Sequence, residues 1–318
     1  MSRITAFSMG VSVLFLFIAT PSFVVGEEAA SSNLQSITVT TSDGVDLYVE
    51  VTGEGTPCLY LHGGPGAASD WMRKLSDGLL EKHFRMVYLD QRGAGRSTSP
   101  ENGDYSMDRM VADFEEVREA LGINEWLTMG HSFGGILQMG YVKRHPDVIK
   151  GMIMLSCSLD LNESLESSWI PRAVELLEIA DPAPYYDQSV PRLERLMPLI
   201  RQMQEKDIFW KFAYASKKSE AVMDTTNEGV AKRNHDLQAA AMGCKDYQED
   251  FRPATAEVTV PVLFFYGRND WMVGPEHYKG VSFPEMMLYG SDVGHFAIID
   301  NRTDLDKAIT AYRAKYDL

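Results

Sequence analysis

The chain has 318 residues, 45% of them hydrophobic and 24% charged, a composition typical of a globular protein that buries a sizeable core. Its formal net charge of −15 argues against a nucleic-acid partner and against electrostatic binding to anionic lipid, because both need a surplus of lysine and arginine. The cysteines Cys58, Cys157 and Cys244 are few and odd in number, which argues against a disulfide framework. No Cys/His cluster in the sequence has zinc-ligand spacing, so we expect no structural zinc site.

The first 26 residues predict a secretory signal peptide. Arg3 precedes an uncharged, largely apolar stretch over residues 4–25, and small residues lie near its end at Gly26. We expect cleavage after Gly26 and export of the protein, into a periplasm or out of the cell. The alternative is an uncleaved N-terminal segment that anchors the protein, because 22 uncharged residues could just span a bilayer. Residues 27–35 follow as a polar linker.

From residue 36 the sequence predicts alternating strands and helices. Two runs of alternating apolar residues flank Asp43-Gly44, a pattern typical of a β-hairpin. Continuous apolar strands are expected at 58–61, 84–89, 126–129 and 152–155, with helical stretches at 71–80, 107–121 and 132–144. Buried strands separated by helices indicate a parallel sheet covered on both faces. We therefore interpret residues 36–156 as the first part of an α/β core.

The alternation stops at about Ser156 and resumes near residue 258. Residues 160–252 contain no strong strand pattern. Helix-compatible stretches lie at 172–179, 193–205 and 207–214. Residues 258–318 return to the earlier pattern, with strands at 262–266 and 285–289 and a closing helix at 303–316. We interpret 157–257 as a helical cap inserted between the two parts of the core.

The run Gly130-His-Ser-Phe-Gly134 fits the pattern Gly-x-Ser-x-Gly, which places a serine on a sharp turn between a strand and a helix. A predicted strand precedes this run and a predicted helix follows it, as the pattern requires. The N-terminus of that helix also favours an anionic intermediate. We expect Ser132 to be a catalytic nucleophile; the structural alternative is a serine that caps the helix.

A serine hydroxyl needs a base to remove its proton, and histidine is suited to that task near neutral pH. Of the histidines after Ser132, His295 lies in a glycine-containing loop that follows a predicted strand, where active-site groups gather on such sheets. Asp270 lies just past the strand at 262–266 and is expected to orient the imidazole. Asp292 is a rival for that role, although residues three apart in a loop rarely reach each other in the required geometry.

An oxyanion hole needs two backbone donors. We expect one from the amide of Phe133, the residue after the nucleophile, and the other from Gly64 or Gly63 in the loop after the strand at 58–61. Pro65 has no N–H and cannot serve. His62 is expected to brace this loop.

Three motifs together resemble the proline iminopeptidase (prolyl aminopeptidase) branch of the α/β hydrolases. They are His62-Gly-Gly-Pro-Gly66, Asp90-Gln-Arg-Gly-Ala-Gly-Arg-Ser97 and Gly130-His-Ser-Phe-Gly134. The resemblance covers 36–156 and 258–318 and implies an α/β-hydrolase fold, in which a mostly parallel sheet is flanked by helices and carries an inserted helical cap. It also implies Ser132, Asp270 and His295 as nucleophile, acid and base. Asp90 and Arg92 are expected to brace the core.

The chain departs from that branch in two places. Those peptidases usually have a tryptophan after the serine, where this chain has Phe133. Their cap carries glutamates that grip the free amino group of the substrate, and no matching helix motif is found in residues 160–252. Glu163, Glu166, Glu175 and Glu178 are candidates by charge alone.

The sequence thus predicts a serine hydrolase that acts through an acyl-enzyme on short peptides or amides, as an aminopeptidase. The alternative within this class is a carboxylesterase for small esters. The alternative of another class is a non-catalytic ligand-binding protein. Dehalogenases and epoxide hydrolases carry an aspartate where this chain has Ser132. No cofactor, no nucleic acid and, once the signal peptide is removed, no stable membrane association are expected.

Overall fold

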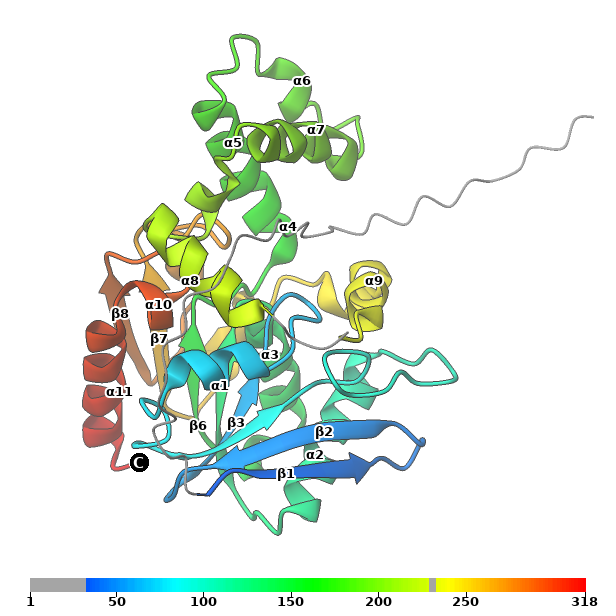
Figure 1. Ribbon diagram of the computed structural model, residues 1–318, viewed down its shortest axis with the longest axis vertical. Coiled ribbons are helices and arrows are strands. Elements are labelled where there is room, and N and C mark those ends of the chain that lie inside the picture. The colour runs from blue at the N-terminus through cyan, green and yellow to red at the C-terminus, as the bar shows by residue number, and fades with distance from the viewer. Residues whose placement is uncertain (1–32, 229–232) are drawn as a thin grey trace, which may run out of the picture. The chain divides into compact units, whose positions relative to one another are not determined.

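The computed structural model describes residues 33–228 and 233–318; the predicted signal peptide and most of the predicted linker lie outside these ranges. The described elements belong to one unit, residues 31–318, built on an eight-stranded sheet (Figure 1). The strands are β1 (Gln35–Thr40), β2 (Asp46–Thr52), β3 (Pro57–Leu61), β4 (Arg85–Leu89), β5 (Trp126–His131), β6 (Ile149–Leu155), β7 (Val262–Gly267) and β8 (Met286–Ser291).

The strand order is β1-β2-β4-β3-β5-β6-β7-β8. The β1–β2 and β2–β4 pairs are antiparallel, and all other neighbouring strands are parallel. The parallel strands therefore bring their carboxyl ends to one edge of the sheet. The loops that follow β3, β5, β7 and β8 meet at this edge, which is where open α/β sheets place their sites.

The predicted hairpin is confirmed. Strands β1 and β2 pair in a register that sets Thr40 opposite Asp46. Gly44 in the connecting turn has a φ of +85°, a left-handed conformation that side chains disfavour and glycine adopts freely.

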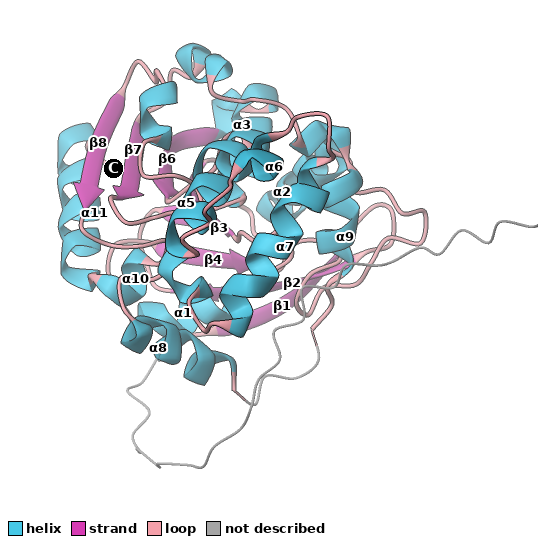
Figure 2. Ribbon diagram, turned by 90° about the horizontal axis from the view of Figure 1, so that it is seen from above, coloured by secondary structure: helices cyan, strands magenta, loops and turns pink. Residues whose placement is uncertain are grey.

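Successive residues of the central strands point to opposite faces of the sheet, and both faces are buried. In β3, Leu59 and Leu61 pack on one face, whereas Cys58 and Tyr60 pack on the other. Helices α2 (Met107–Ala120) and α3 (Gly134–Arg144) cover the first face. Helices α1 (Asp70–Ser76), α10 (Ala297–Asp300) and α11 (Arg302–Tyr316) cover the second face (Figure 2). The expected fold class, a mostly parallel sheet flanked by helices, is confirmed.

Between β6 and β7, the described residues hold helices and no strand. The elements are α4 (Leu161–Glu163), η2 (Ser164–Trp169), α5 (Ile170–Leu176), α6 (Ala183–Tyr186), α7 (Arg192–Glu205), η3 (Phe209–Phe212), α8 (Lys217–Asn227), α9 (Asp236–Gly243), η4 (Lys245–Tyr247) and η5 (Pro253–Glu257). Short 3-10 turns also lie at η1 (Pro146–Val148) and η6 (His277–Gly280). Ile170, Leu199 and Phe212 belong to a separate apolar cluster within this region.

The helix predicted at 207–214 is wrong in extent. Only the short 3-10 helix η3 forms there, from Phe209 to Phe212. Asp207 has a φ of +53°, so a left-handed residue follows the end of α7 and breaks the helical path.

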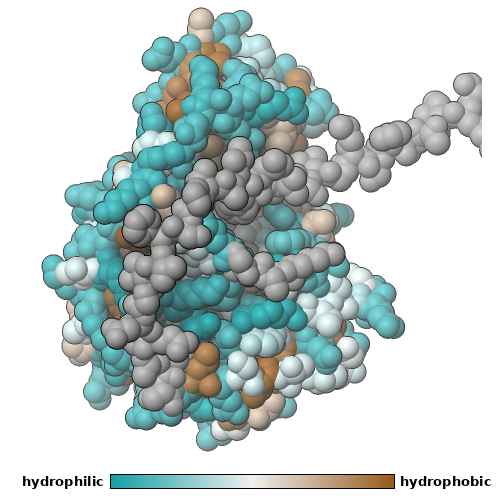
Figure 3. Space-filling model, in the orientation of Figure 1, coloured by the Kyte–Doolittle hydropathy of each residue, from teal (hydrophilic) through white to brown (hydrophobic). Residues whose placement is uncertain are grey.

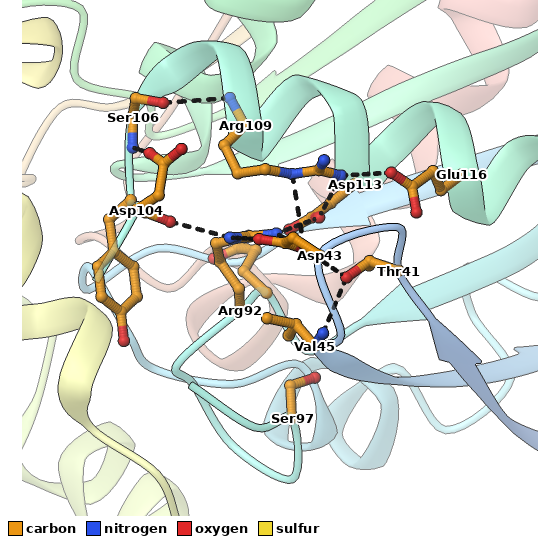
Figure 4. A network of polar contacts seen from close by, with 12 residues as sticks. Thr41, Asp43, Val45, Arg92, Ser97, Asp104, Ser106, Arg109, Asp113 and Glu116 are labelled. Atoms are coloured by element: carbon orange, nitrogen blue, oxygen red, sulfur yellow. Dashed lines mark hydrogen bonds and ion pairs between the residues drawn. The ribbon is translucent and has the colours of Figure 1, made fainter. Parts of the chain in front are cut away.

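A buried arginine ties the hairpin to the core (Figure 4). The Arg92 guanidinium is fully buried and donates to Asp113 Oδ2 at 2.6 Å, to Asp43 Oδ2 at 2.9 Å and to the carbonyl oxygen of Asp104 at 2.9 Å. These partners come from α2, from the hairpin turn and from the loop before α2. The hydrogen bond from Arg92 is the main cause that lowers the pKa of Asp43 to about 2. Arg92 therefore braces the core, as expected.

Among the residues that are coloured by hydropathy in Figure 3, hydrophilic ones predominate. In the two described ranges, no helix is both long and apolar enough to cross a lipid bilayer.

Candidate active site

Ser132 occupies a strained turn between β5 and α3. Its φ is +57°, a left-handed conformation that is uncommon for any residue with a side chain and clusters at functional sites. The Ser132 N–H donates to the Leu155 carbonyl at 3.3 Å, and the Ser132 carbonyl accepts from the Gly135 N–H at 3.0 Å. These bonds to the end of β6 and the start of α3 hold the turn in place.

Two glycines let the backbone crowd around this turn. A Cβ on Gly134 would overlap the Leu61 carbonyl oxygen at the end of β3. A Cβ on Gly63 would lie 2.6 Å from the Ser132 Cβ and 3.3 Å from its Oγ. The glycine-rich loop after β3 therefore lies directly against Ser132, as an oxyanion hole requires.

His295 and Asp270 form a buried pair. The His295 Nδ1–H donates to Asp270 Oδ2 at 2.9 Å, and both residues are 3% exposed. The other carboxylate oxygen, Oδ1, accepts from the N–H groups of Met272 at 3.0 Å and Val273 at 3.2 Å. A carboxylate can only accept, so this arrangement puts the proton on Nδ1 and leaves Nε2 as the ring nitrogen able to take up another.

His131, which precedes the serine, joins the two halves of the site. Its Nε2–H donates to the His295 carbonyl oxygen at 2.9 Å, and the two ring centroids are 4.5 Å apart. Burial, followed by the neighbouring His295, holds the pKa of His131 well below its usual value, so this ring is neutral. The structure has no hydrogen bond between Ser132 and His295 among the described residues; such contacts are often long before substrate binds.

His62 braces its loop. Its Nε2 accepts from the Gln91 N–H at 3.1 Å, so Nδ1 carries the proton and donates to the Gly63 carbonyl at 3.1 Å. Burial lowers the pKa of His62 to about 4. A neutral ring with both nitrogens engaged is a structural group and not a base.

The rival acid Asp292 points elsewhere. Its carboxylate pairs with Arg268 at 2.9 Å, and its side chain is 82% exposed. The imidazole of His295 has Asp270 as its carboxylate partner. Asp270 is therefore the better candidate.

The backbone of Phe133 is the first candidate oxyanion donor. Its side chain is buried and packs edge-on against Tyr247 at 5.2 Å, which fixes the residue just before α3 begins. The first N–H groups of a helix lack partners within the helix. Gly64, the other candidate, has a φ of +115° that a side chain would disfavour.

Three of the four candidate glutamates have internal partners. Glu163 pairs with His277 at 2.8 Å, Glu166 with Arg195 at 3.0 Å and Glu175 with Arg172 at 2.7 Å. Glu178 is exposed. A carboxylate already engaged by a side chain of the protein is less available to a substrate ammonium group. Within 33–228 and 233–318, no three His, Cys, Asp or Glu side chains form a group that could hold a metal ion.

Two further hydrogen bonds hold His295 and its loop, and the sequence gives no sign of either. The His295 N–H donates to the Ala213 carbonyl at 2.7 Å, and Asp300 Oδ2 accepts from the Gly294 N–H at 2.8 Å. No sequence pattern pointed to a site role for His131, Ala213 or Asp300. A backbone carbonyl such as that of Ala213 leaves no trace in the residue type.

Comparisons with known proteins identify the family of the chain. The family model described as "alpha/beta hydrolase fold" matches residues 56–302. A proline iminopeptidase from Neisseria gonorrhoeae is 38% identical over 134 residues, which are 40% of this chain and 41% of that protein. The chain thus spans about two fifths of the length of the curated relatives it matches.

Two solved structures share the fold. A proline iminopeptidase-related protein from Thermus thermophilus has a TM-score of 0.72 at 23% identity, covering 89% of this chain and 98% of that one. An esterase from Exiguobacterium antarcticum has a TM-score of 0.64 at 20% identity, covering 87% of this chain and 99% of that one. The expected resemblance to proline iminopeptidases is confirmed, and the chain belongs to the alpha/beta hydrolase fold family.

Proposed function

We propose that the protein is a serine hydrolase that works through an acyl-enzyme, with Ser132 as nucleophile, His295 as base and Asp270 as the acid that orients the base. The buried Asp270–His295 pair, bonded through His131 to the turn that carries Ser132, is the observation that carries this proposal. A non-catalytic binding protein would not need a strained serine beside such a pair.

In this mechanism the Ser132 hydroxyl oxygen attacks the carbonyl carbon of the substrate while His295 Nε2 takes the hydroxyl proton. The amide of Phe133 and that of Gly64 or Gly63 donate to the resulting oxyanion. The tetrahedral intermediate collapses, and the leaving group departs with the proton from His295. A water molecule then attacks the acyl-enzyme by the same route, which releases the acid and restores Ser132.

The first substrate class is a short peptide or amide, cleaved as an aminopeptidase would cleave it. The Neisseria gonorrhoeae relative, named a proline iminopeptidase, supports this class over the part of the chain it matches. The match covers about two fifths of that relative. The proposed substrate class therefore rests on the matched part of the core.

The second class is a small ester, and the pairing of the glutamates favours it. Glu163 and Glu166 engage His277 and Arg195, and a peptidase of this kind would need free carboxylates for the substrate amino group.

Hydrolysis of proline naphthylamide and of a short-chain nitrophenyl ester separates the two classes, with Ser132→Ala as the blank. Cleavage of the naphthylamide supports the aminopeptidase. Cleavage of the ester alone removes the aminopeptidase and leaves the esterase. If neither is cleaved, labelling of Ser132 by a fluorophosphonate decides whether the protein is a hydrolase at all.

We also propose that residues 1–26 are a signal peptide and that the protein is exported without a stable membrane anchor. The apolar stretch after Arg3 and the small residues before Glu27 support this proposal.

A further inference from the structure

One short stretch of the cap region contacts both loops that carry the candidate acid and base. We call this stretch, Phe212–Ala215, the tether. The Trp271 N–H, next to Asp270, donates to the Phe212 carbonyl at 2.9 Å. The His295 N–H donates to the Ala213 carbonyl at 2.7 Å. Adjacent peptide groups of the tether thus hold two loops that lie 25 residues apart in the chain.

Asp300, the last residue of α10, fastens the tether to the His295 loop. Its Oδ2 accepts from the Gly294 N–H at 2.8 Å and from the Ala215 N–H at 3.2 Å. One carboxylate oxygen therefore bridges the residue before the base and the end of the tether. The other oxygen, Oδ1, is buried without a hydrogen-bond partner among the described residues, a cost to stability that this bridge must offset.

Side-chain packing also joins the tether to the loop that carries His295. The rings of Tyr214 and Phe296 stack with centroids 5.0 Å apart and planes 18° apart. A Cβ on Gly294 would overlap the Ala213 carbonyl, so only glycine allows this approach of the two backbones. The tether and the His295 loop are in direct contact on both sides of the base.

The cap region also grips the Asp270 loop. The Trp169 Nε1–H donates to the Met272 carbonyl at 2.8 Å, and the Ser168 hydroxyl donates to the Trp271 carbonyl at 2.7 Å. Trp169 in turn packs on Phe212, with ring centroids 5.4 Å apart. The start of the tether is therefore held against the loop that carries Asp270, and its end against the loop that carries His295.

We propose that Asp300 is a positioning residue, which acts with the tether to set the place of His295 relative to Ser132. The inference rests on the proposed function, because it concerns the base of that reaction. The tether begins at the last residue of η3 and leads to α8, so the acid–base pair contacts the chain where these two elements are joined. Loss of the bridge slows the chemical step and leaves binding almost unchanged, because a displacement of about 1 Å in a reacting group can cost about 100-fold in rate.

The test is the kinetics of labelling by a fluorophosphonate, in which the serine oxygen displaces fluoride from phosphorus. Its saturation curve separates the binding constant KI from the rate constant kinact. For Asp300→Ala we expect kinact to fall about 10- to 100-fold while KI stays within about twofold. Asp300→Asn restores kinact to within about threefold, because its amide oxygen can accept both N–H groups.

The matched control is Asp306→Ala. Asp306 is an aspartate on the next helix that bonds Lys82 and His83, so its loss leaves kinact unchanged. Thermal melting checks that each variant is folded. If Asp300→Ala does not fold, Tyr214→Leu decides, because it removes the stack on Phe296 but keeps the backbone of the tether, and kinact is again expected to fall.

Unchanged kinact in the folded Asp300→Ala variant, or in Tyr214→Leu where that variant decides, overturns the positioning role and leaves the proposed function intact. Equal slowing by Asp300→Asn and Asp300→Ala also overturns it, since charge and not the bridge would then matter. A wild-type protein that resists labelling removes the proposed function, and this inference with it.

Discussion

The Nδ1 atom of His295 lies 2.9 Å from Oδ2 of Asp270, although the two residues are 25 positions apart in the chain. Strand β8 and its flanking turns separate them, and the parallel pairing of β7 with β8 brings the two loops to the same edge of the sheet. The contact follows from the topology and needs no local sequence signal.

Replacing Asp270 by Asn is expected to lower kcat about 1,000- to 10,000-fold with little change in KM. The amide would stabilise the wrong tautomer of His295 and could not stabilise the imidazolium. Steady-state kinetics on whichever test substrate is cleaved measures the effect. The control is Asp292→Asn, which removes the exposed partner of Arg268 and leaves kcat within about twofold. If kcat falls more in Asp292→Asn than in Asp270→Asn, Asp292 and not Asp270 is the acid that orients His295.

Replacing Gly134 by Ala is expected to destabilise the fold by about 2 kcal/mol or more, because the new Cβ would overlap the Leu61 carbonyl oxygen in β3. Chemical denaturation measures the free energy of unfolding. Gly243→Ala is the matched control, since this glycine lies at the end of α9 with open space around it. There the substitution is neutral or slightly stabilising. Equal stability of the two variants would show that the turn around Ser132 is loosely packed.

The order of strands and helices in the core could be predicted from the sequence, because buried strands are continuous apolar runs. The ends of these predicted strands also located Ser132, Asp270 and His295, because each of them follows a strand. Helix ends were harder to predict. The helix predicted at 71–80 ends at Ser76, because Asp77 takes a left-handed φ of +44°, and Asp207 interrupts the cap helices in the same way. Aspartate tolerates this conformation but does not require it.

The contacts between the cap region and the core could not be predicted. The tether bonds His295 and Trp271 through backbone carbonyls, which every residue has. The pairing of Glu163 with His277 joins residues 114 positions apart, at the end of α4 and the start of η6. Periodicity says nothing about such contacts, because they depend on how the cap helices sit on the loops.

The pair of the buried Arg92 and the half-buried Asp43 predicts that the stability of the fold depends on pH. Because the folded pKa of Asp43, about 2, lies below its ordinary value of 3.8, the pair stabilises the fold above about pH 4, and this contribution fades as the pH falls towards 2. Asp43→Asn is expected to lower the free energy of unfolding by about 1 kcal/mol at pH 7, since the carboxylate keeps some contact with solvent. Urea denaturation at pH 7 and at about pH 3 measures the difference, which shrinks at the lower pH.

The control for that series is Glu276→Gln, which breaks the exposed pair with Lys279. It changes stability by less than about 0.5 kcal/mol at either pH. If Asp43→Asn lowers the free energy of unfolding equally at both pH values, the negative charge of Asp43 does not contribute to its stabilising contact with Arg92.

Export is tested by the mass of the protein isolated from its own cells. Cleavage after Gly26 predicts a mature chain that begins at Glu27. If the measured mass includes residues 1–26 and the protein is recovered in the membrane fraction, these residues form an uncleaved membrane anchor and not a signal peptide.

Serine reactivity tests the central claim most directly. Wild-type protein is treated with a fluorophosphonate, digested and mapped by mass spectrometry, with Ser132→Ala treated in parallel. The proposed mechanism predicts one added phosphonyl group, on the peptide that contains Ser132, and no label in the variant. Wild-type protein that stays unlabelled, or equal labelling of Ser132→Ala, would contradict a nucleophilic role for Ser132.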